Sequence, residues 1–349
     1  MRRFFMHTWI LEKPGLFSRT EPGHMADPAA GEVLVKVHRM GLCGTDYHAY
    51  QGEQPYFAYP RLLGHELGVE VIATGEDVQQ IAAGDRCAVR PYLACGRCDA
   101  CLRGYTNACE QMQVLGVHVD GGLQLYLKLP ASQLHKSSTL SFDALALVEP
   151  LSIGAHAVHR ARLQADDRVL ILGAGPIGLA VATFAGLHQL QKLAVADLQA
   201  QRLSFLQKLS FPQRPSPVLL SQEPMEQICA AFDGKKPTVI FDATGNARSM
   251  EQCFSYAAQG ARIIYVGLCQ QHLSFSDPLF HQKELTLFAS RNSLPADFAY
   301  IIELLESGHL QVQAWVTHRY PLAQLPQAFE AIHQTRDDIC LKAMIDMET

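Results

Sequence analysis

The stretch DRVLILGAGPIGLAVATFAGL, residues 167–187, runs from a short apolar segment into a glycine-rich turn and then into a second apolar run. Gly173, Gly175 and Gly178 form the pattern G-x-G-x-x-G within it. After an apolar segment, this pattern predicts a strand, a tight turn and a helix whose N-terminus receives the pyrophosphate of a dinucleotide. Residues 169–172 are therefore expected to form a buried strand, with a helix directly after the turn.

Further buried strands are predicted in three segments that each lead into a turn: KLAVAD (192–197), TVIFDATG (238–245) and ARIIYVGL (261–268). The first of them ends in Asp197, about twenty residues after the last glycine, where a carboxylate accepts hydrogen bonds from the adenosine ribose. That carboxylate would repel a 2′-phosphate, so the sequence favours NAD over NADP. The strands together predict a doubly wound parallel sheet, as in a Rossmann domain.

The composition is that of a globular protein with more than one domain. Its 349 residues exceed what one hydrophobic core usually serves, and 48% of them are hydrophobic. A net charge of -5 offers no basic surface to nucleic acid or to anionic lipid. No stretch approaches the roughly 18 apolar residues of a membrane span, and the start, MRRFFMHTWILEKPG, lacks the apolar run of a signal peptide. We expect a cytoplasmic protein without nucleic-acid or membrane partners.

The chain has ten cysteines, and four of them cluster in CGRCDACLRGYTNAC with the spacing C-x2-C-x2-C-x7-C. Disulfides are not expected in the cytoplasm, so clustered thiols predict metal ligands. Four thiolates complete a closed tetrahedron, which indicates a structural zinc site rather than a catalytic one. An iron-sulfur cluster or a redox pair would use the same thiolates and remains an alternative. The four ligands are Cys95, Cys98, Cys101 and Cys109.

The N-terminal part is predicted to be a β-rich lobe. Residues 59–91 alternate valine and isoleucine with glycine turns, a pattern typical of short strands. This lobe also carries GLCGTDYHAYQG (41–52) and the pair His65-Glu66, whose spacing alone does not decide between metal ligands and a surface feature. Further along, Glu149 precedes Pro150 at the end of an apolar run, and a helical pattern follows.

Taken in order, GLCGTDYH, GHE, GEDV, AGDRCAVRP, the cysteine loop, DGG, EPLSIGAHA, GAGPIGL and VADLQAQRL resemble a known family over nearly the whole chain. It is that of the zinc-dependent medium-chain dehydrogenases/reductases, in the polyol (sorbitol-type) branch. The resemblance implies an α/β fold with a GroES-like, β-rich catalytic domain at residues 1–150 and a C-terminal return at 290–349. A Rossmann NAD-binding domain is then expected at 151–289, in a homo-oligomer such as a dimer or tetramer.

The resemblance also implies a catalytic zinc ion, held by Cys43 and His65. Polyol dehydrogenases supply a glutamate before proline as the third ligand, which here is Glu149. Glu66 is the other acid of this region, and relatives place it either on the metal or just behind it. Together with the cysteine cluster, about two zinc ions per chain are expected.

The proton and hydride paths are hypotheses that follow from this resemblance. Zinc would lower the pKa of a substrate alcohol, and the hydride would pass to the nicotinamide. The proton would leave through Thr45, a cofactor ribose hydroxyl and His48, whereas Asp46 is expected only to close its own turn. The expected catalytic residues are Cys43, Thr45, His48 and Glu66. The expected cofactor contacts are Gly173, Gly175, Pro176, Ile177, Gly178, Asp197, Arg202, Thr244, Val266, Gly267, Leu268 and Arg291; for Thr244, Val266 and Gly267, simple strand termination is the alternative.

No single local motif predicts the substrate, so its class is inferred from several separate stretches. HAYQGEQPYFAYPRLLGHE, LGVHVDGG, FSDPLFHQKE, SRNSLPADF and THRYP look most like the bacterial L-galactonate 5-dehydrogenase type. A sugar acid carries a carboxylate, so a cation is needed, and Arg291 is a candidate for that role as well as for the cofactor. A neutral polyol dehydrogenase and an L-threonine 3-dehydrogenase are alternatives, the latter disfavoured by Glu149-Pro150. A catalytically inactive nucleotide-binding sensor is a further alternative, but it would have no use for an open metal site.

Overall fold

The computed structural model describes residues 8–20, 26–334 and 339–348. They form two compact units: unit 1 falls within Met1–Glu149, Leu294–Gly308 and Trp315–Thr349, and unit 2 within Pro150–Ser293 and His309–Ala314. We expect no signal peptide at the start of the sequence. Residues 1–7 of that segment lie outside the described residues. Among the helices in these ranges, none combines the length and apolar character that crossing a membrane requires.

Unit 2 is built on a six-stranded parallel sheet with the order β12-β11-β10-β13-β14-β15. Its strands are β10 (Arg168–Leu172), β11 (Lys192–Asp197), β12 (Ser216–Leu219), β13 (Val239–Asp242), β14 (Arg262–Tyr265) and β15 (Thr286–Ala289). The predicted strands at 169–172, 192–197, 238–245 and 261–268 are confirmed. The strand order reverses between β10 and β13, and ligands of open parallel sheets bind at such a point.

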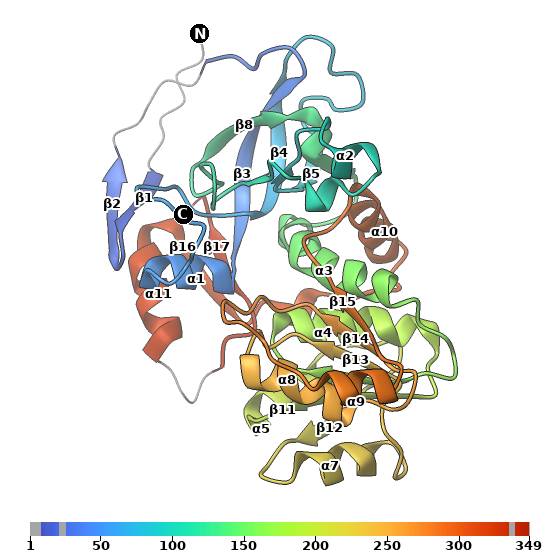
Figure 1. Ribbon diagram of the computed structural model, residues 1–349. Coiled ribbons are helices and arrows are strands. Elements are labelled where there is room, and N and C mark those ends of the chain that lie inside the picture. The colour runs from blue at the N-terminus through green and yellow to red at the C-terminus, as the bar shows by residue number, and fades with distance from the viewer. Residues whose placement is uncertain (1–7, 21–25, 335–338, 349) are drawn as a thin grey trace. The chain divides into compact units, whose positions relative to one another are not determined.

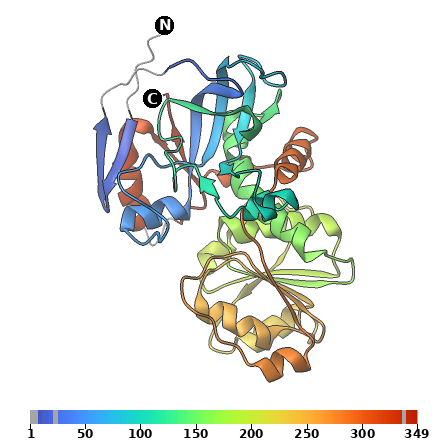
Figure 2. The same cartoon turned by 45° about the horizontal axis from the view of Figure 1, so that its top comes forward.

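Helices cover both faces of this sheet, as apolar strands buried on two sides require. Figure 2 shows the green helices of unit 2 on one side of the sheet and the gold and orange helices on the other. The helices are α4 (Pro176–Ala185), α5 (Ala200–Leu203), α6 (Phe205–Lys208), α7 (Pro224–Ala231), α8 (Ala247–Tyr256), α9 (Asp277–Gln282) and the short 3-10 helix η3 (Gly186–His188). Every residue of α4 from Gly178 to Ala185 is buried, which explains the uniformly apolar sequence after the glycine turn.

Unit 1 is built on a seven-stranded sheet with the order β16-β17-β3-β4-β5-β9, and β8 pairs with β3. Its strands are β3 (Glu32–Leu42), β4 (Glu66–Thr74), β5 (Arg86–Val89), β8 (Tyr126–Pro130), β9 (Leu134–Ser137), β16 (His318–Pro321) and β17 (Ala343–Asp346). Two smaller sheets are β1 (Thr8–Lys13) with β2 (Leu16–Thr20), and β6 (Tyr92–Leu93) with β7 (Gln113–Val114). The helices are α1 (Gly44–Gln51), α2 (Asp99–Leu102), α10 (Pro295–Glu306), α11 (Leu325–Gln334), and the 3-10 helices η1 (Thr106–Ala108), η2 (Ala131–Gln133), η4 (Gln313–Trp315, at the division between the units) and η5 (Leu322–Gln324).

Three neighbouring strands of unit 1 bring distant parts of the sequence together. Strand β17 pairs antiparallel with β3, so that Ala343 lies opposite Leu42. On the other side of β3, Gly41 lies opposite Glu66 of β4. Helix α1 starts directly after β3 and packs on α11, where Tyr47 contacts the ring of Phe329 at 5.0 Å between centroids. The end of β3 is therefore flanked by β4 and β17, which come from distant parts of the sequence (Figure 1).

Helix α3 (Phe142–Ala161) begins earlier than the sequence indicates, and the division between the two units falls within it. A helical pattern is apparent only after Pro150, yet the helix includes that proline and the apolar run before it. An interior proline costs about 3 kcal/mol because it removes a hydrogen bond and crowds the preceding turn. The side chains around it, from Leu145 to Leu151, are almost completely buried, and this packing outweighs the cost.

Candidate functional site

The first candidate metal site lies at the end of β3 in unit 1. The ligand atoms of Cys43, His65 and Glu66 all lie within 4.8 Å of one another. Cys43 is the residue before α1, and the other two begin β4, so strand pairing brings them together. A thiolate, an imidazole and a carboxylate are donors that zinc accepts, and three protein ligands leave a position for substrate.

Asp46 is part of this site as well as of its own turn. One of its oxygens accepts the backbone N–H of Cys43 at 2.9 Å, as the sequence predicts. Its other oxygen, Oδ1, lies 3.7 Å from Nδ1 of His65. Both of these atoms are buried, and neither has a hydrogen-bond partner in the part of the chain that the structure describes. A carboxylate behind the second ring nitrogen is typical of a metal-binding histidine, so the arrangement fits a metal on the other nitrogen.

Glu149 lies on α3 with its side chain buried in unit 1, where the phenol of Tyr92 donates a hydrogen bond to its Oε1. Its carboxylate is not one of the three groups that lie within 4.8 Å of one another. Burial, opposed in part by His65, raises the pKa of Glu149 to about 7. Burial likewise raises the pKa of Asp46. Burial thus disfavours the charged forms of both carboxylates, and a divalent cation would favour them, so the residues fit zinc.

Lys342 forms a buried ion pair with Glu66. Its Nζ lies 2.6 and 2.7 Å from the two carboxylate oxygens, and it also donates to the carbonyl of Leu42 at 3.1 Å. Gly41 makes room for this carboxylate, because a Cβ there would stand 2.1 Å from Oε2 of Glu66. Both oxygens are held by one ammonium, which favours a position for Glu66 behind the metal rather than on it. Lys342 was not among the residues expected from the sequence, although a lysine within the apolar run CLKAMI was a usable signal.

The second candidate metal site is the four-cysteine lobe, residues 95–109. Its four sulfurs lie within 4.8 Å of one another. Backbone N–H groups point at them: those of Cys95 and Gln111 both donate to Sγ of Cys109 at 3.3 Å. Backbone donors lower the pKa of Cys95 to about 6 and that of Cys98 as well, which favours thiolates at these two positions, whereas burial raises the pKa of Cys101 to about 12. Four converging sulfurs fit a closed tetrahedral zinc site with a structural role.

Metal analysis of the freshly prepared, chelator-free protein is expected to give about two zinc ions per chain, one for each set of ligands. Cys98→Ser is expected to remove about one of them and to lower the yield of folded protein, because a structural zinc site contributes directly to folding. Cys229→Ser, at a half-buried cysteine of α7 outside both groups, serves as the control and should keep both ions. A zinc content of one or none in the unmodified protein would contradict this assignment.

The glycine turn of unit 2 is shaped to receive a phosphate. A Cβ on Gly178 would lie 1.8 Å from the carbonyl oxygen of Gly173, so no other residue fits there. Helix α4 begins directly after Gly175, with Pro176 at its first position and Ile177 next, where a missing proline N–H costs nothing. The remaining N–H groups of this first turn are available to an anion.

Asp197 ties the end of β11 to this turn. Its Oδ2 accepts the N–H of Ala174 at 2.8 Å, and its Oδ1 accepts that of Gln199 at 2.9 Å. A carboxylate can accept about four hydrogen bonds, so capacity for ribose hydroxyls remains. Arg202 lies nearby in sequence on α5 and is exposed.

Asp242, which the sequence analysis did not single out, organises the neighbouring strand ends. Its side chain accepts the N–H and the hydroxyl of Thr244 at 2.9 and 2.7 Å. Its carbonyl accepts the N–H groups of Val266 and Gly267 at 2.9 and 3.0 Å. These residues follow the carboxyl ends of β13 and β14, where a cofactor binds in such sheets. The remaining expected contacts, Leu268 and Arg291, are exposed and follow β14 and β15.

Thr45 and His48 share one face of α1, because residues three apart on a helix are neighbours. Thr45 is half-buried, two positions from Cys43. His48 is exposed, and its Nδ1 lies 3.2 Å from Oε2 of Glu53. The pair thus runs from the metal group towards solvent along one helical turn.

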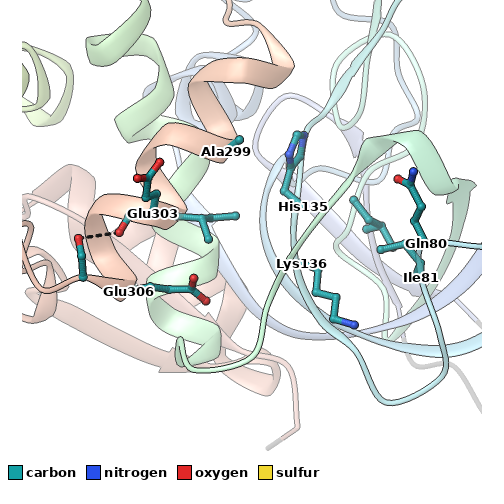
Figure 3. Close-up of a pocket in the computed structure, with 10 residues that line it drawn as sticks. Gln80, Ile81, His135, Lys136, Ala299, Glu303 and Glu306 are labelled. Carbon is teal, nitrogen blue, oxygen red and sulfur yellow. Dashed lines mark hydrogen bonds between the residues drawn. The ribbon is translucent and has the colours of Figure 1, made fainter.

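Unit 1 also contains a cavity of about 660 Å³ between β9 and α10. Figure 3 shows Glu303 and Glu306 of α10 on one side of it, and His135 and Lys136 of β9 on the other. Neither metal group contributes a residue to its lining, so it is a separate feature of the unit.

Known proteins match both units. Residues 29–139 match the family model of the alcohol dehydrogenase GroES-like domain, and residues 176–307 match that of the zinc-binding dehydrogenases. The chain is 40% identical over 304 residues to L-galactonate-5-dehydrogenase of Escherichia coli K12, covering 87% of this chain and 88% of that protein. It is 31% identical over 328 residues to sorbitol dehydrogenase of Bacillus subtilis 168, covering 90% of each.

A solved structure of RspB from Escherichia coli CFT073, described as an alcohol dehydrogenase complexed with NADH, has the same fold. The TM-score is 0.90 at 31% identity, and the match covers 98% of this chain and 99% of that one. The expected family and the expected GroES-like and Rossmann folds are confirmed. The chain belongs to the zinc-binding alcohol dehydrogenase family.

Proposed function

We propose that this protein oxidises a secondary alcohol of a sugar acid of the L-galactonate kind with NAD, and can run the reverse reduction. The observation that carries the proposal is the open group of Cys43, His65 and Glu66 in a chain that also has a dinucleotide-binding turn. A relative 40% identical is named for the oxidation of L-galactonate, which supports the sugar acid. We propose that the protein acts in the cytoplasm as a homo-oligomer, which light scattering of the purified protein would test.

The residues of this chain would share the work of the reaction. Cys43 and His65 would hold zinc. We propose Glu149 as the third ligand, as the resemblance to polyol dehydrogenases implies, while Lys342 holds Glu66 behind the metal. When bound, zinc supplies a Lewis acid that lowers the pKa of the substrate hydroxyl, and NAD accepts the hydride. The hydroxyl of Thr45 would receive the substrate proton and pass it to a ribose hydroxyl of the bound cofactor, from which His48 would pass it to solvent. The oxygens of Asp197 hold the adenosine ribose of the cofactor.

Asp197 should make the enzyme prefer NAD, and Asp197→Ala should raise the NADP-to-NAD ratio of kcat/KM by about tenfold or more, equivalent to 1.4 kcal/mol. The reason is that alanine removes both a ribose acceptor and a charge that repels the 2′-phosphate. Asp197→Asn is the matched control, because it keeps an acceptor for the N–H of Ala174 while removing the charge. Equal rates with both cofactors in the unmodified enzyme would refute this role of Asp197.

Arg291 is proposed to bind the substrate carboxylate. Arg291→Leu should weaken binding of an aldonate by about ten- to a hundredfold, because a hydrogen bond between charged groups contributes about 1.5–3 kcal/mol. Binding of a neutral polyol of the same length should change far less, since it has no carboxylate to lose. An equal loss for both substrates would indicate a general structural role for Arg291, and a loss confined to NAD affinity would assign it to the cofactor.

The alternative substrate is a neutral polyol, supported by the 31% identity to a sorbitol dehydrogenase. Incubating the zinc-loaded protein with NAD and a panel of aldonates, polyols and L-threonine, while following NADH absorbance, distinguishes these substrates. Turnover of aldonates above all others is the expected result. An enzyme that turned over only neutral polyols or only L-threonine would contradict the sugar-acid assignment, and a protein that bound NAD without turnover of any substrate would indicate a sensor.

A further inference from the structure

The four-cysteine lobe joins the rest of unit 1 through a small two-stranded ribbon, β6 and β7. The chain enters the lobe shortly after Leu93 of β6 and returns shortly before Gln113 of β7. Within the ribbon Tyr92 pairs with Val114, and Leu115 donates its N–H to the carbonyl of Pro91 at 3.1 Å. A metal that holds the four cysteines together would therefore hold the two strands of the ribbon in register.

Tyr92 links this ribbon to the open metal site. Its side chain is buried, and its phenol donates a hydrogen bond to Oε1 of Glu149. Its own backbone is fixed by Arg90, whose Nη1 donates to the Tyr92 carbonyl at 2.9 Å. The backbone N–H of Arg90 in turn donates to the carbonyl of Gln133 at 2.8 Å, which anchors Arg90 to η2, directly before β9. Tyr92 is thus held both at its backbone carbonyl and at its side-chain hydroxyl.

The two glutamates of the site have donors of different charge. Lys342 brings a full positive charge to both oxygens of Glu66. Tyr92 donates a neutral hydroxyl to Glu149, which fixes the direction of that carboxylate. Because one ammonium engages both oxygens of Glu66, the donors favour a place behind the metal for Glu66.

We propose that Tyr92 is a positioning residue that orients Glu149 towards the open metal site, and that the four-cysteine lobe acts on that site through Tyr92. The inference rests on the proposed function only in taking Cys43, His65 and Glu149 as the metal ligands. Hydrogen-bond partners behind metal ligands commonly contribute ten- to a hundredfold to metal affinity. The cysteine lobe then has a task beyond its own folding, namely to keep Tyr92 against Glu149.

Tyr92→Phe tests this with zinc as the probe. Its open site is expected to bind zinc about tenfold more weakly in chelator competition, and the visible spectrum of a cobalt-substituted open site should change. The zinc of the cysteine lobe should stay in place. Tyr256→Phe is the matched control, because its buried phenol donates to Gln252 at 3.0 Å in unit 2. Wild-type zinc affinity and an unchanged cobalt spectrum in Tyr92→Phe would overturn the proposal.

A double-mutant comparison tests the part played by the lobe. Cys98→Ser should weaken zinc binding at the open site in the unmodified chain, but add little in the Tyr92→Phe chain, because the route is already interrupted. If Cys98→Ser does not fold, Arg90→Met tests whether the backbone of Tyr92 belongs to the route, since it removes the hydrogen bond to the Tyr92 carbonyl and lies in neither metal group. If the separate losses of zinc affinity in Cys98→Ser and Tyr92→Phe simply multiply in the double variant, the lobe does not act through Tyr92.

The outcome is separable from that of the proposed function, because metal affinity is measured without substrate. A protein with the expected loss of affinity in Tyr92→Phe but no activity on any substrate would support the inference and defeat the enzymatic proposal. A dehydrogenase active on aldonates whose Tyr92→Phe variant bound zinc normally would do the reverse.

Discussion

Cys43→Ser is expected to lower dehydrogenase activity by about a thousandfold or more while the protein stays folded. A catalytic metal contributes several kcal/mol to its reaction, and about 4 kcal/mol corresponds to a factor of a thousand in rate. Serine keeps nearly the same shape but offers a neutral hydroxyl instead of a thiolate, so the open site loses its strongest ligand. Cys43 is only half-buried and is not one of the buried residues that form the hydrophobic core cluster of unit 1.

The measurement combines NADH absorbance with zinc content and circular dichroism. Cys43→Ser should retain about one zinc ion per chain, the one held by the cysteine lobe, together with an unchanged far-ultraviolet spectrum. Cys229→Ser again serves as the control and should keep full activity. A Cys43→Ser enzyme with normal turnover would show that the open group of Cys43, His65 and Glu66 is not the catalytic centre.

Lys342→Met is expected to lower the free energy of unfolding by about 3–5 kcal/mol, because it leaves the carboxylate of Glu66 buried without its charge partner. The side chains of the two residues are 3% and 1% exposed, so water cannot replace the lost ammonium. Urea unfolding of the zinc-loaded protein measures the change. Glu66→Gln in the same chain should restore part of the loss, because no unpaired charge then remains.

The chain offers a matched control for this prediction. Lys36 and Glu348 form an ion pair at the same 2.6 Å, but their side chains are 26% and 41% exposed. Exposed pairs contribute about 0–1 kcal/mol, so Lys36→Met should have little effect. Losses of equal size for Lys342→Met and Lys36→Met would mean that the buried pair contributes no more than a surface one.

The features of this protein that could be predicted from the sequence are those formed by residues close together in the chain. The apolar strands, the glycine turn and the cysteine spacing are local patterns, and the structure has the predicted strands and gathers the four sulfurs. Asp46 was visible too, but only as a turn residue, because its approach to His65 depends on how β3 meets β4.

Lys342 and Tyr92 could not be predicted in the same way. Lys342 reaches Glu66 across 276 positions through the register of β17 on β3, and Tyr92 reaches Glu149 across 57. A shift of that register by one residue would turn Lys342 to the other face of the sheet, and no local pattern specifies it. Burial, which makes both contacts matter, is likewise a property of the assembled unit.

The place of β17 next to β3 has a consequence for the order in which the protein is made. On the ribosome, Glu66 and its neighbours emerge first, then all of Pro150–Ser293, and only afterwards Lys342 and the strand β17 that directly follows it. Unit 2 is a continuous stretch apart from one short segment, so its sheet can form during synthesis while unit 1 still lacks its last strands. Until β17 is added, closing the core around Glu66 would bury a carboxylate that has no charge partner. The incomplete unit 1 is therefore expected to stay open, so that chaperones and zinc can still reach it.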